Sequence, residues 1–556
     1  MTNFLEPEYL LDRGPDGLTH AVERALWHLG FVDVRVIDGA NDGGADLLAV
    51  RSREQWVIQC KWSLRGSIDV SGVDDAERAR TTYGADHAVL ATNGTLNGPG
   101  QRRLDALSRA GIRIDLWHGT TLTEIWNRMP TEVPIRYKLR PYQIAAADAI
   151  DRDLSDHGKA LLVLATGLGK TVVGGEIIRR HLTSKPDAEV LVVAHMKDLV
   201  EQLERALWPH LPKFIQTQLL TGDDKPLHLG GVTVATIDSV LGIVESGWRP
   251  GLIMVDETHH VGESGMYARL LDLASEAKIF GVTATPWRGD KFDIATRFGR
   301  PSFTMSIAEG MAQGYLTKVD YRLYVDNVDW DFVHSRSAHG FSLKDLNSKL
   351  FIPQRDDEII DRLREAWKQT REPRAILFCQ TIEHAERMAD ELSRADDVWQ
   401  RAAYLHSGMS RQRRQILLNA FRLGRVPVIT CVDVFNEGVD VPDVNLIGFL
   451  RVTHSRRIFV QQLGRGLRLS EGKESLRVLD FVTDVRRVAA TLDLKRSLGA
   501  MRRGDVEELD LPGGSRIEFS DETAGSLLDY WIQDAASLET SADEVRLQFP
   551  WSNGLV

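Results

Sequence analysis

The sequence predicts an α/β protein with several domains, on three observations. At 556 residues the chain exceeds what one hydrophobic core usually supports, since domains commonly hold about 100–200 residues. Short apolar runs of strand length alternate with longer segments of helical periodicity along most of the chain. The apolar runs are continuous rather than alternating, which is typical of parallel strands covered on both faces.

The first α/β block is expected at about residues 14–126. Its opening helix carries an apolar face and ends at Gly30, where glycine favours termination; this face consists of Leu18, Val22, Ala25, Leu26 and Leu29. Strands are expected at 32–37, 46–50, 55–62, 87–92 and 112–117. A segment with three prolines, 127–141, reads as a linker to the next block.

Two further blocks have the continuous apolar runs, separated by helical segments, that are typical of parallel sheets. The second is expected to place strands at 160–166, 189–194, 232–236, 252–256 and 278–284. The third is expected to place them at 374–379, 426–431, 445–450 and 477–482. The predicted domains are therefore 1–130, 131–310, 311–484 and an acidic extension, 485–556, while 300–350 and the region after about 485 carry no readable motif.

Composition narrows the class of protein. The chain has 43% hydrophobic and 26% charged residues, which excludes a mainly disordered, collagen-like or coiled-coil chain. No apolar run approaches the roughly 20 residues needed to span a bilayer, and the N-terminus lacks the pattern of a secretory signal. Three scattered cysteines, Cys60, Cys379 and Cys431, exclude a disulfide framework and are expected as small buried hydrophobes. We expect a cytoplasmic protein with no membrane partner.

Charge is distributed unevenly. The net charge is −11, but residues 505–556 hold twelve acids against Arg516 and Arg546, which leaves about −1 for the rest of the chain. Residues 401–468 hold eleven arginines, no lysine and four acids. Such a stretch can grip nucleic-acid phosphates, although a solvated helix face explains Arg411, Arg413 and Arg414 equally well.

A glycine-rich loop predicts a phosphate site. The strand at 160–166 runs into Gly167–Thr171 and then into a helical segment, and backbone N–H groups at such a helix start cradle phosphates. Lys170 is expected to reach the outer phosphates of a nucleotide and Thr171 to hold Mg²⁺. The strict pattern lacks its first glycine because Leu164 stands there, so the tripeptide alone does not exclude a structural turn.

Paired acids follow the strand at 252–256. Acids at this position are costly unless they bind a metal or activate water, so Asp256 is expected to serve Mg²⁺ and Glu257 to orient or deprotonate the attacking water. A surface turn rich in acids is the competing interpretation. The occurrence of loop and acids in order on adjacent blocks favours a nucleotide site.

Further motifs complete an ordered set. ATGLGKT (165–171), DETH (256–259), TAT (283–285) and QQLGRGLR (461–468) resemble the motifs of superfamily 2 DExH-type helicases, and are most similar to those of restriction-enzyme translocases. The resemblance covers about 135–484 and implies an ATP site built from two RecA-like domains. Its implied nucleotide-site residues, in addition to Lys170, Thr171, Asp256 and Glu257, are Gln143, Thr166, Gly167, Gly169, His259, Gly438 and Asp440.

The resemblance implies specific roles for some of these positions. Gln143, in LRPYQ (139–143), would contact adenine, and Arg465 and Arg468 would act as arginine fingers on the γ-phosphate. Thr236 and Ser239, in VATIDS (234–239), would contact the DNA backbone. The two domains would close on ATP and step along nucleic acid in each cycle.

In the first block, a predicted hairpin brings Asp46 close to Gln59 and Lys61. An acid, a second oxygen ligand and a lysine can bind Mg²⁺ and polarise water against a phosphodiester, although this spacing alone also occurs by accident. NDGGAD (41–46), IQCKW (58–62), ATNGTLNGPG (91–100) and Glu23 resemble the Mrr-like branch of restriction-endonuclease-fold nucleases. Glu23 would supply another carboxylate if its helix packs on the hairpin, whereas the nearby His20 is expected to be an ordinary helix-surface residue.

These observations predict an ATP-dependent DNA helicase or translocase coupled to a Mg²⁺-dependent endonuclease. By resemblance the setting is restriction or anti-phage defence, with DNA and defence-system proteins as partners. Two alternatives stay open at this point. One is a DNA-repair motor whose N-terminal domain only binds DNA, and the other is an RNA-remodelling ATPase.

Overall fold

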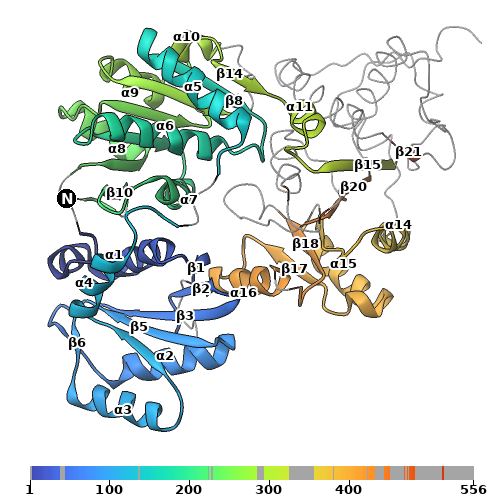
Figure 1. The fold of residues 1–556 in the computed structure, drawn as a ribbon. Coiled ribbons are helices and arrows are strands. Elements are labelled where there is room, and N and C mark those ends of the chain that lie inside the picture. The colour runs from blue at the N-terminus through green and yellow to red at the C-terminus, as the bar shows by residue number, and fades with distance from the viewer. Residues whose placement is uncertain are drawn as a thin grey trace, which may run out of the picture.

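The computed structural model describes most of the chain. The described residues are 3–37, 44–134, 138–222, 224–226, 229–284, 293–324, 356–379, 381–422, 424–432, 444–450, 469, 473, 475–481 and 516–518. They form three α/β domains, each around its own sheet (Figure 1). We call them the N-terminal domain (3–134), the middle domain (138–312) and the third domain (318–324, 356–481 and 516–518).

The N-terminal domain has a mixed five-stranded sheet in the order β1-β2-β3-β5-β7. The first three strands are antiparallel and the last three are parallel. Its strands are β1 Val32–Val36, β2 Leu47–Arg51, β3 Glu54–Lys61, β5 His87–Thr92 and β7 Ile114–Trp117, with a two-stranded sheet of β4 Ser67–Ile68 and β6 Thr95–Leu96. Its helices are α1 Pro7–His28, α2 Val70–Tyr83, α3 Gly98–Arg109 and α4 Gly119–Arg128.

The middle domain has a seven-stranded parallel sheet in the order β10-β11-β9-β12-β13-β8-β14. Its strands are β8 Lys159–Leu164, β9 Val190–Ala194, β10 Thr217–Leu220, β11 Val232–Thr236, β12 Leu252–Asp256, β13 Lys278–Thr283 and β14 Phe303–Met305. Its helices are α5 Pro141–Asp156, α6 Lys170–Ser184, α7 Lys197–Leu207, η1 Trp208–His210, α8 Ile237–Glu245, η2 Thr258–His260, α9 Met266–Leu273, α10 Ala295–Phe298 and α11 Ile307–Ala312.

The third domain has a sheet in the order β17-β18-β16-β19-β20-β15-β21, parallel except where β21 pairs with β15. Its strands are β15 Lys318–Tyr324, β16 Ala375–Phe378, β17 Ala403–His406, β18 Val428–Val432, β19 Leu446–Phe449, β20 Ser475–Phe481 and β21 Arg516–Glu518. Its helices are α14 Asp356–Lys368, α15 Ile382–Ala395, η3 Asp397–Trp399 and α16 Arg411–Arg422.

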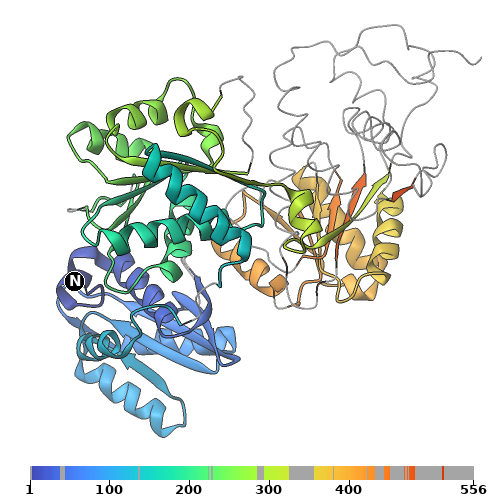
Figure 2. The same cartoon turned by 45° about the horizontal axis from the view of Figure 1, so that its top comes forward.

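The predicted α/β class, with one mixed and two largely parallel sheets, is confirmed. The long apolar runs form the central strands, because a strand buried on both faces must be apolar throughout. The fold also contains strands that the sequence did not indicate. Among them, β14 and β15 lie in the region 300–350, and Figure 2 shows the chain crossing there from the middle domain to the third.

The first helix is longer than its apolar face predicted. It begins at Pro7, and Gly14, at φ +70°, kinks it before the predicted apolar face starts at Leu18. Of the three cysteines, Cys379 and Cys431 are buried as expected, while Cys60 is half-buried.

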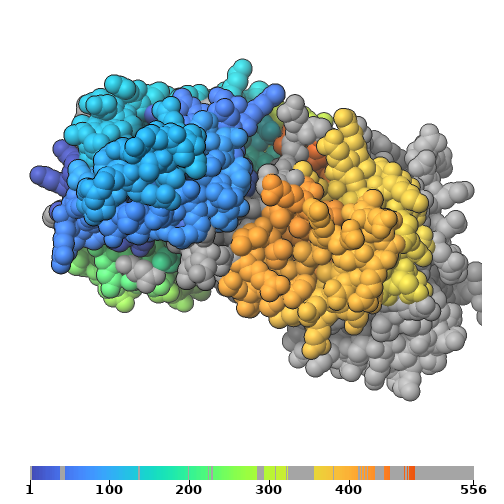
Figure 3. Space-filling view, turned by 90° about the horizontal axis from the view of Figure 1, so that it is seen from below, coloured from blue at the N-terminus to red at the C-terminus, as the bar shows by residue number. Residues whose placement is uncertain are grey.

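The N-terminal domain packs against the middle domain. Figure 1 shows α1 directly below β10 and α7, and Lys213 ties the two domains by donating from Nζ to the carbonyls of Trp126 and Met129. Seen from below, the N-terminal domain and the third domain lie side by side (Figure 3). Within the described residues, no helix is long and apolar enough to cross a membrane.

Candidate functional site

The glycine-rich loop of the middle domain links β8 to α6 at the carboxyl end of β8. Gly167 and Gly169 take φ values of +91° and +81°, a region that favours glycine. A Cβ added at Gly169 would lie 2.7 Å from Gln143 Nε2, so a side chain has no room there. Lys170 and Thr171 are the first two residues of α6, where backbone N–H groups lack partners within the helix. The loop can therefore cradle an anion.

Gln143 supports this loop from behind. Its side-chain Nε2 donates to Leu168 O at 3.1 Å and its Oε1 accepts from Arg140 N at 2.9 Å. The Tyr142 hydroxyl donates to the same Leu168 carbonyl at 2.6 Å. Both polar atoms of the Gln143 amide thus bond to protein groups, and its adenine contact stays a prediction.

The paired acids stand opposite the loop. Asp256 ends β12, and Glu257 follows it in the left-handed region at φ +48°. This turn brings Glu257 Oε1 to 4.0 Å from Lys170 Nζ. A strained backbone of this kind persists where the surrounding structure holds it, often at functional sites.

The two acids differ in ionisation. Burial, then the neighbouring Glu257, raises the pKa of Asp256 to about 7. Burial also opposes ionisation of Glu257, but Lys170 and then His259 outweigh it and lower its pKa to about 2. A buried carboxyl that resists ionisation beside another acid fits a Mg²⁺ ligand, because the cation would supply the missing positive charge.

Histidines border the acids. His259 Nδ1 lies 3.2 Å from Glu257 Oε2, which places this predicted site residue beside the acid. The rings of His259 and His260 are 4.4 Å apart, and those of His260 and His195 are 3.9 Å apart. His195 follows β9 and was not identified from the sequence, because a histidine after a strand carries no motif of its own.

The remaining helicase-like positions divide into two groups. Thr236 caps the start of α8 and its Oγ1 donates to Ser239 Oγ at 2.9 Å, so this predicted pair is placed together. Gly438, Asp440, Arg465 and Arg468 lie outside the described residues. Their predicted roles stay predictions.

In the N-terminal domain, the β2–β3 hairpin pairs Leu47 with Ile58, which sets Asp46 against the end of β3. Gln59 Nε2 donates to Asp46 Oδ2 at 2.6 Å, and the Cys60 backbone N–H donates to the same oxygen at 2.5 Å. Gln59 is only 4% exposed, and its Oε1 is buried without a hydrogen-bond partner. A buried acceptor oxygen left without a donor beside a carboxylate fits a Mg²⁺ ligand.

Lys61 has a partner that the sequence did not indicate. Its Nζ lies 2.7 Å from Asp75 Oδ2 of α2, and Arg78 contacts the other oxygen of Asp75 at 2.9 Å. Asp75 lies on a helix beyond the predicted motif, and nothing in the spacing of the sequence pairs it with Lys61. The described residues contain no group of three or more His, Cys, Asp or Glu side chains that could hold a metal ion.

Glu23 lies on α1, which contacts the hairpin strands β2 and β3 of its own domain. Its carboxylate faces the middle domain. It is 1% exposed, and its Oε1 and Oε2 lie 2.9 and 3.1 Å from Arg205 Nε of α7. The expectation of a helix-surface His20 is wrong, since its Nε2 lies 2.6 Å from Glu204 Oε2 and its ring meets Trp208 edge-on. An interface between domains of one chain leaves no periodic signal, so the sequence did not indicate it.

Comparison with known proteins gives each domain a family. Residues 11–126 match the family model "Restriction endonuclease", 136–288 match "Type III restriction enzyme, res subunit", and 357–470 match "Helicase conserved C-terminal domain". These matches confirm the resemblance to superfamily 2 helicases and to Mrr-like nucleases.

Individual relatives share 27–28% sequence identity with this chain. The chain is 28% identical over 331 residues to a 51.5 kDa protein of a Lactococcus phage, with 57% of this chain and 64% of the phage protein covered. It is 27% identical to the DNA 3'-5' translocase XPB2 of Sulfurisphaera tokodaii, with 63% of this chain and 82% of that protein covered.

It is also 27% identical to the EcoAI type I restriction endonuclease subunit of Escherichia coli, with 62% of this chain and 46% of the subunit covered. The chain thus spans less than two thirds of the phage protein and about half of the restriction subunit. Among solved structures, the type ISP restriction-modification enzyme LlaBIII bound to DNA aligns at TM-score 0.51 and 16% identity, covering 95% of this chain and 43% of that enzyme. This likeness concerns the fold.

Proposed function

We propose that this chain, which joins a restriction-endonuclease domain to the two domains of a superfamily 2 helicase, is an ATP-driven DNA translocase that also cuts DNA. The observation that carries the proposal is the packing of the nuclease-type domain on the middle domain through buried ion pairs. An ATPase site and a nuclease site on two domains that pack together suit a motor that delivers DNA to a nuclease.

The ATPase chemistry follows from the middle domain. The α6 N-terminus and Lys170 would neutralise phosphate charge, and Glu257, kept ionised by Lys170, would orient the attacking water and draw its proton. Thr171 and Asp256 would hold Mg²⁺, which stabilises charge on the transferred phosphoryl group. We propose that Arg465 and Arg468 complete the site from the third domain.

The proposed nuclease chemistry uses residues of the N-terminal domain. Asp46 and the free Oε1 of Gln59 would hold Mg²⁺, which lowers the pKa of bound water and polarises the phosphodiester. Lys61 would stabilise the charge that develops on the phosphate. Its pairing with Asp75 would orient the ammonium.

Restriction or anti-phage defence is the biological role that we propose, with DNA as substrate and defence-system proteins as partners. The matches to restriction-enzyme families support it. It would place the protein in the cytoplasm, where phage DNA enters.

The test is cleavage of plasmid DNA, modified and unmodified, with Mg²⁺ or Mn²⁺ and with or without ATP. ATPase stimulation by duplex DNA, single-stranded DNA and RNA is measured in parallel. DNA-stimulated hydrolysis together with Asp46-dependent cleavage supports the proposal. DNA-stimulated ATP hydrolysis without any DNA cleavage would favour the alternative of a DNA-repair motor. ATP hydrolysis stimulated by RNA alone would favour the alternative of an RNA-remodelling ATPase.

A further inference from the structure

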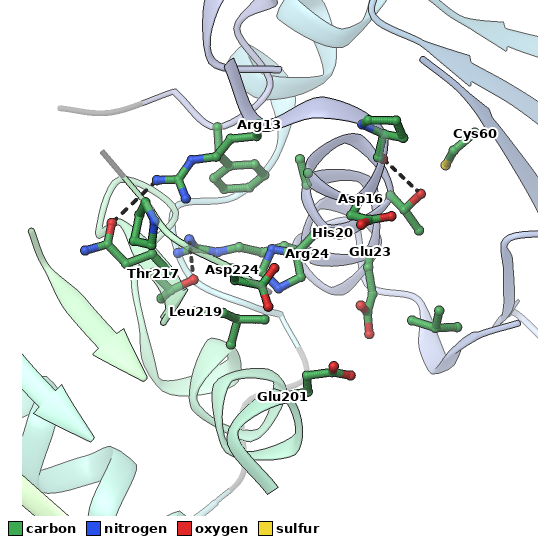
Figure 4. Close-up of a pocket in the computed structure, with 18 of the residues that line it drawn as sticks. Arg13, Asp16, His20, Glu23, Arg24, Cys60, Glu201, Thr217, Leu219 and Asp224 are labelled. Carbon is green, nitrogen blue, oxygen red and sulfur yellow. Dashed lines mark hydrogen bonds between the residues drawn. The ribbon is translucent and has the colours of Figure 1, made fainter. Parts of the chain in front are cut away.

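The interface between the N-terminal and middle domains is built from charged side chains. His20 and Glu23 of α1 pair with Glu204 and Arg205 of α7. Arg24 lies beside His20 and Glu23 on α1 (Figure 4). Glu23, Arg24 and Glu204 are 1%, 3% and 0% exposed. Buried charges are costly unless each is paired, so the arrangement is specific to this docking.

Two of these contacts fasten the domains. Arg24 donates to the carbonyl of Ile215 at 2.7 Å and to that of Pro212 at 3.3 Å, both on the middle domain. Burial opposes the charge of His20, but Glu204 outweighs it and raises the pKa of His20. Neither contact involves the predicted nuclease residues, so their role is to hold the domains together.

The Glu23–Arg205 pair is different because Glu23 was expected at the nuclease site. Arg205 Nε approaches both carboxylate oxygens of Glu23, while Arg205 Nη1 lies 3.6 Å from Glu201. Burial raises the pKa of Glu23, and Arg205 opposes that shift. Glu23 is therefore a buried carboxylate whose charge depends on a cation supplied by the other domain.

Glu23 and Asp46 line one cavity. A cavity of about 520 Å³ between the two domains is lined by Glu23, Asp46 and Cys60 of the N-terminal domain and by Arg205 of the middle domain. Thr19 lies beside the Cys60 thiol, and Glu23 follows Thr19 by one helical turn on the same face of α1. The face of α1 that carries Glu23 thus adjoins the cavity that Asp46 and Cys60 also line.

From this geometry we propose that Arg205 withholds Glu23 from the metal position beside Asp46 and Gln59. The inference rests on the proposed nuclease function. With Glu23 held by Arg205, Asp46 is the one anionic ligand among the described residues of this site, because Gln59 is neutral. Movement of α7 away from α1 would release Glu23 and add a second carboxylate, and the affinity of an oxygen site for a divalent cation rises with its ligand charge. Arg205 is then a positioning residue through which the motor controls the nuclease.

The test measures Mn²⁺ binding to the full chain without nucleotide, by electron paramagnetic resonance of the free ion. All proteins carry Asp256→Asn, which removes the metal-binding carboxylate of the ATP site. Arg205→Met should bind Mn²⁺ about tenfold more tightly, since a carboxylate gained by the site joins Asp46. Adding Glu23→Gln should cancel the gain. Arg269→Met is the matched control, because Arg269 pairs with Glu245 on the middle domain away from the interface.

Glu23→Gln alone gives a second readout, which applies even if Arg205→Met fails to fold. The inference expects unchanged Mn²⁺ affinity, since Glu23 is not a ligand in the docked state. A loss of affinity in this variant, or unchanged affinity in folded Arg205→Met, would overturn it.

Asp46→Asn separates this inference from the proposed function. Mn²⁺ binding that Asp46→Asn abolishes but Arg205→Met leaves unchanged overturns the Arg205 inference alone. If no variant shows Asp46-dependent binding and the protein cuts no DNA, the nuclease function itself is overturned.

Discussion

The two candidate sites hold their lysines in different ways. In the middle domain, Lys170 Nζ stands 4.0 Å from Glu257 Oε1, at the mouth of a loop shaped to receive an anion. In the N-terminal domain, Lys61 Nζ makes a 2.7 Å ion pair with Asp75, and the nearby Glu23 is taken by Arg205. The loop and the paired acids of the candidate ATP site thus lie within one domain, whereas residues of the candidate nuclease site contact neighbours, one of them on another domain.

This difference indicates which site depends on the rest of the molecule. The phosphate loop is shaped by contacts from Gln143 and Tyr142, which lie within the same domain. Asp46 lines a cavity together with residues of the middle domain, so the position of that domain bears on this part of the candidate nuclease site. The predictions below test this contrast, beginning with the largest expected effect.

Lys170→Ala should lower ATP turnover by about 10²–10³-fold, since a positioned cation on the phosphates is worth this much in related chemistry. Glu257→Gln should retain ATP binding and lose hydrolysis to a similar extent. Steady-state ATPase assays with nucleotide-binding titrations check both. DNA-dependent hydrolysis near the wild-type rate in either variant would show that the loop and the acids are not the ATP site.

Asp46→Asn should lower DNA cleavage by roughly 10²-fold or more while DNA-stimulated ATPase stays near wild type. Asp46 is the anionic partner of Gln59, and it lies on a different domain from the phosphate loop. Lys61→Ala should act the same way. A parallel loss of ATPase would contradict the separation of the two sites.

Gln59→Glu should keep cleavage within about tenfold of wild type and shift the preference between Mg²⁺ and Mn²⁺, because it adds charge at an oxygen already placed for a metal. Cleavage rates over a range of each metal measure this. Complete loss of cleavage by a folded Gln59→Glu would show that the neutral amide is required.

The smallest effect should be a pH dependence of domain docking. The docked pKa of His20 is raised, so its contribution is full below about 6.5 and is lost as pH rises through the docked value. Burial opposes ionisation of Glu204, but His20 outweighs it and lowers the pKa, so the Glu204 contribution is lost as pH falls. Docking should therefore be strongest in a window between these limits.

Limited proteolysis between the two domains, at pH 5 to 9, measures that window. His20→Gln should remove the loss of docking at high pH, because glutamine does not titrate. An identical pH profile in wild type and His20→Gln would show that this contact does not contribute to docking.

The sequence determined the class of fold and the local chemistry. Continuous apolar strands require two-sided burial and so predict parallel sheets, and the loop at Gly167–Thr171 and the acids at Asp256 and Glu257 each lie within a few residues of one strand end. Asp46 and Gln59 were equally predictable, because a hairpin register brings them together.

Only the tertiary structure decided what those residues contact beyond their own strands. Nothing in the spacing of Lys61 indicates Asp75, and nothing on the apolar face of α1 indicates that His20 and Glu23 meet Glu204 and Arg205. The physical reason is that periodicity records which face of an element is buried, whereas pairing between elements far apart in the chain depends on how whole domains pack. The engagement of Glu23 by the middle domain is a contact of this second kind.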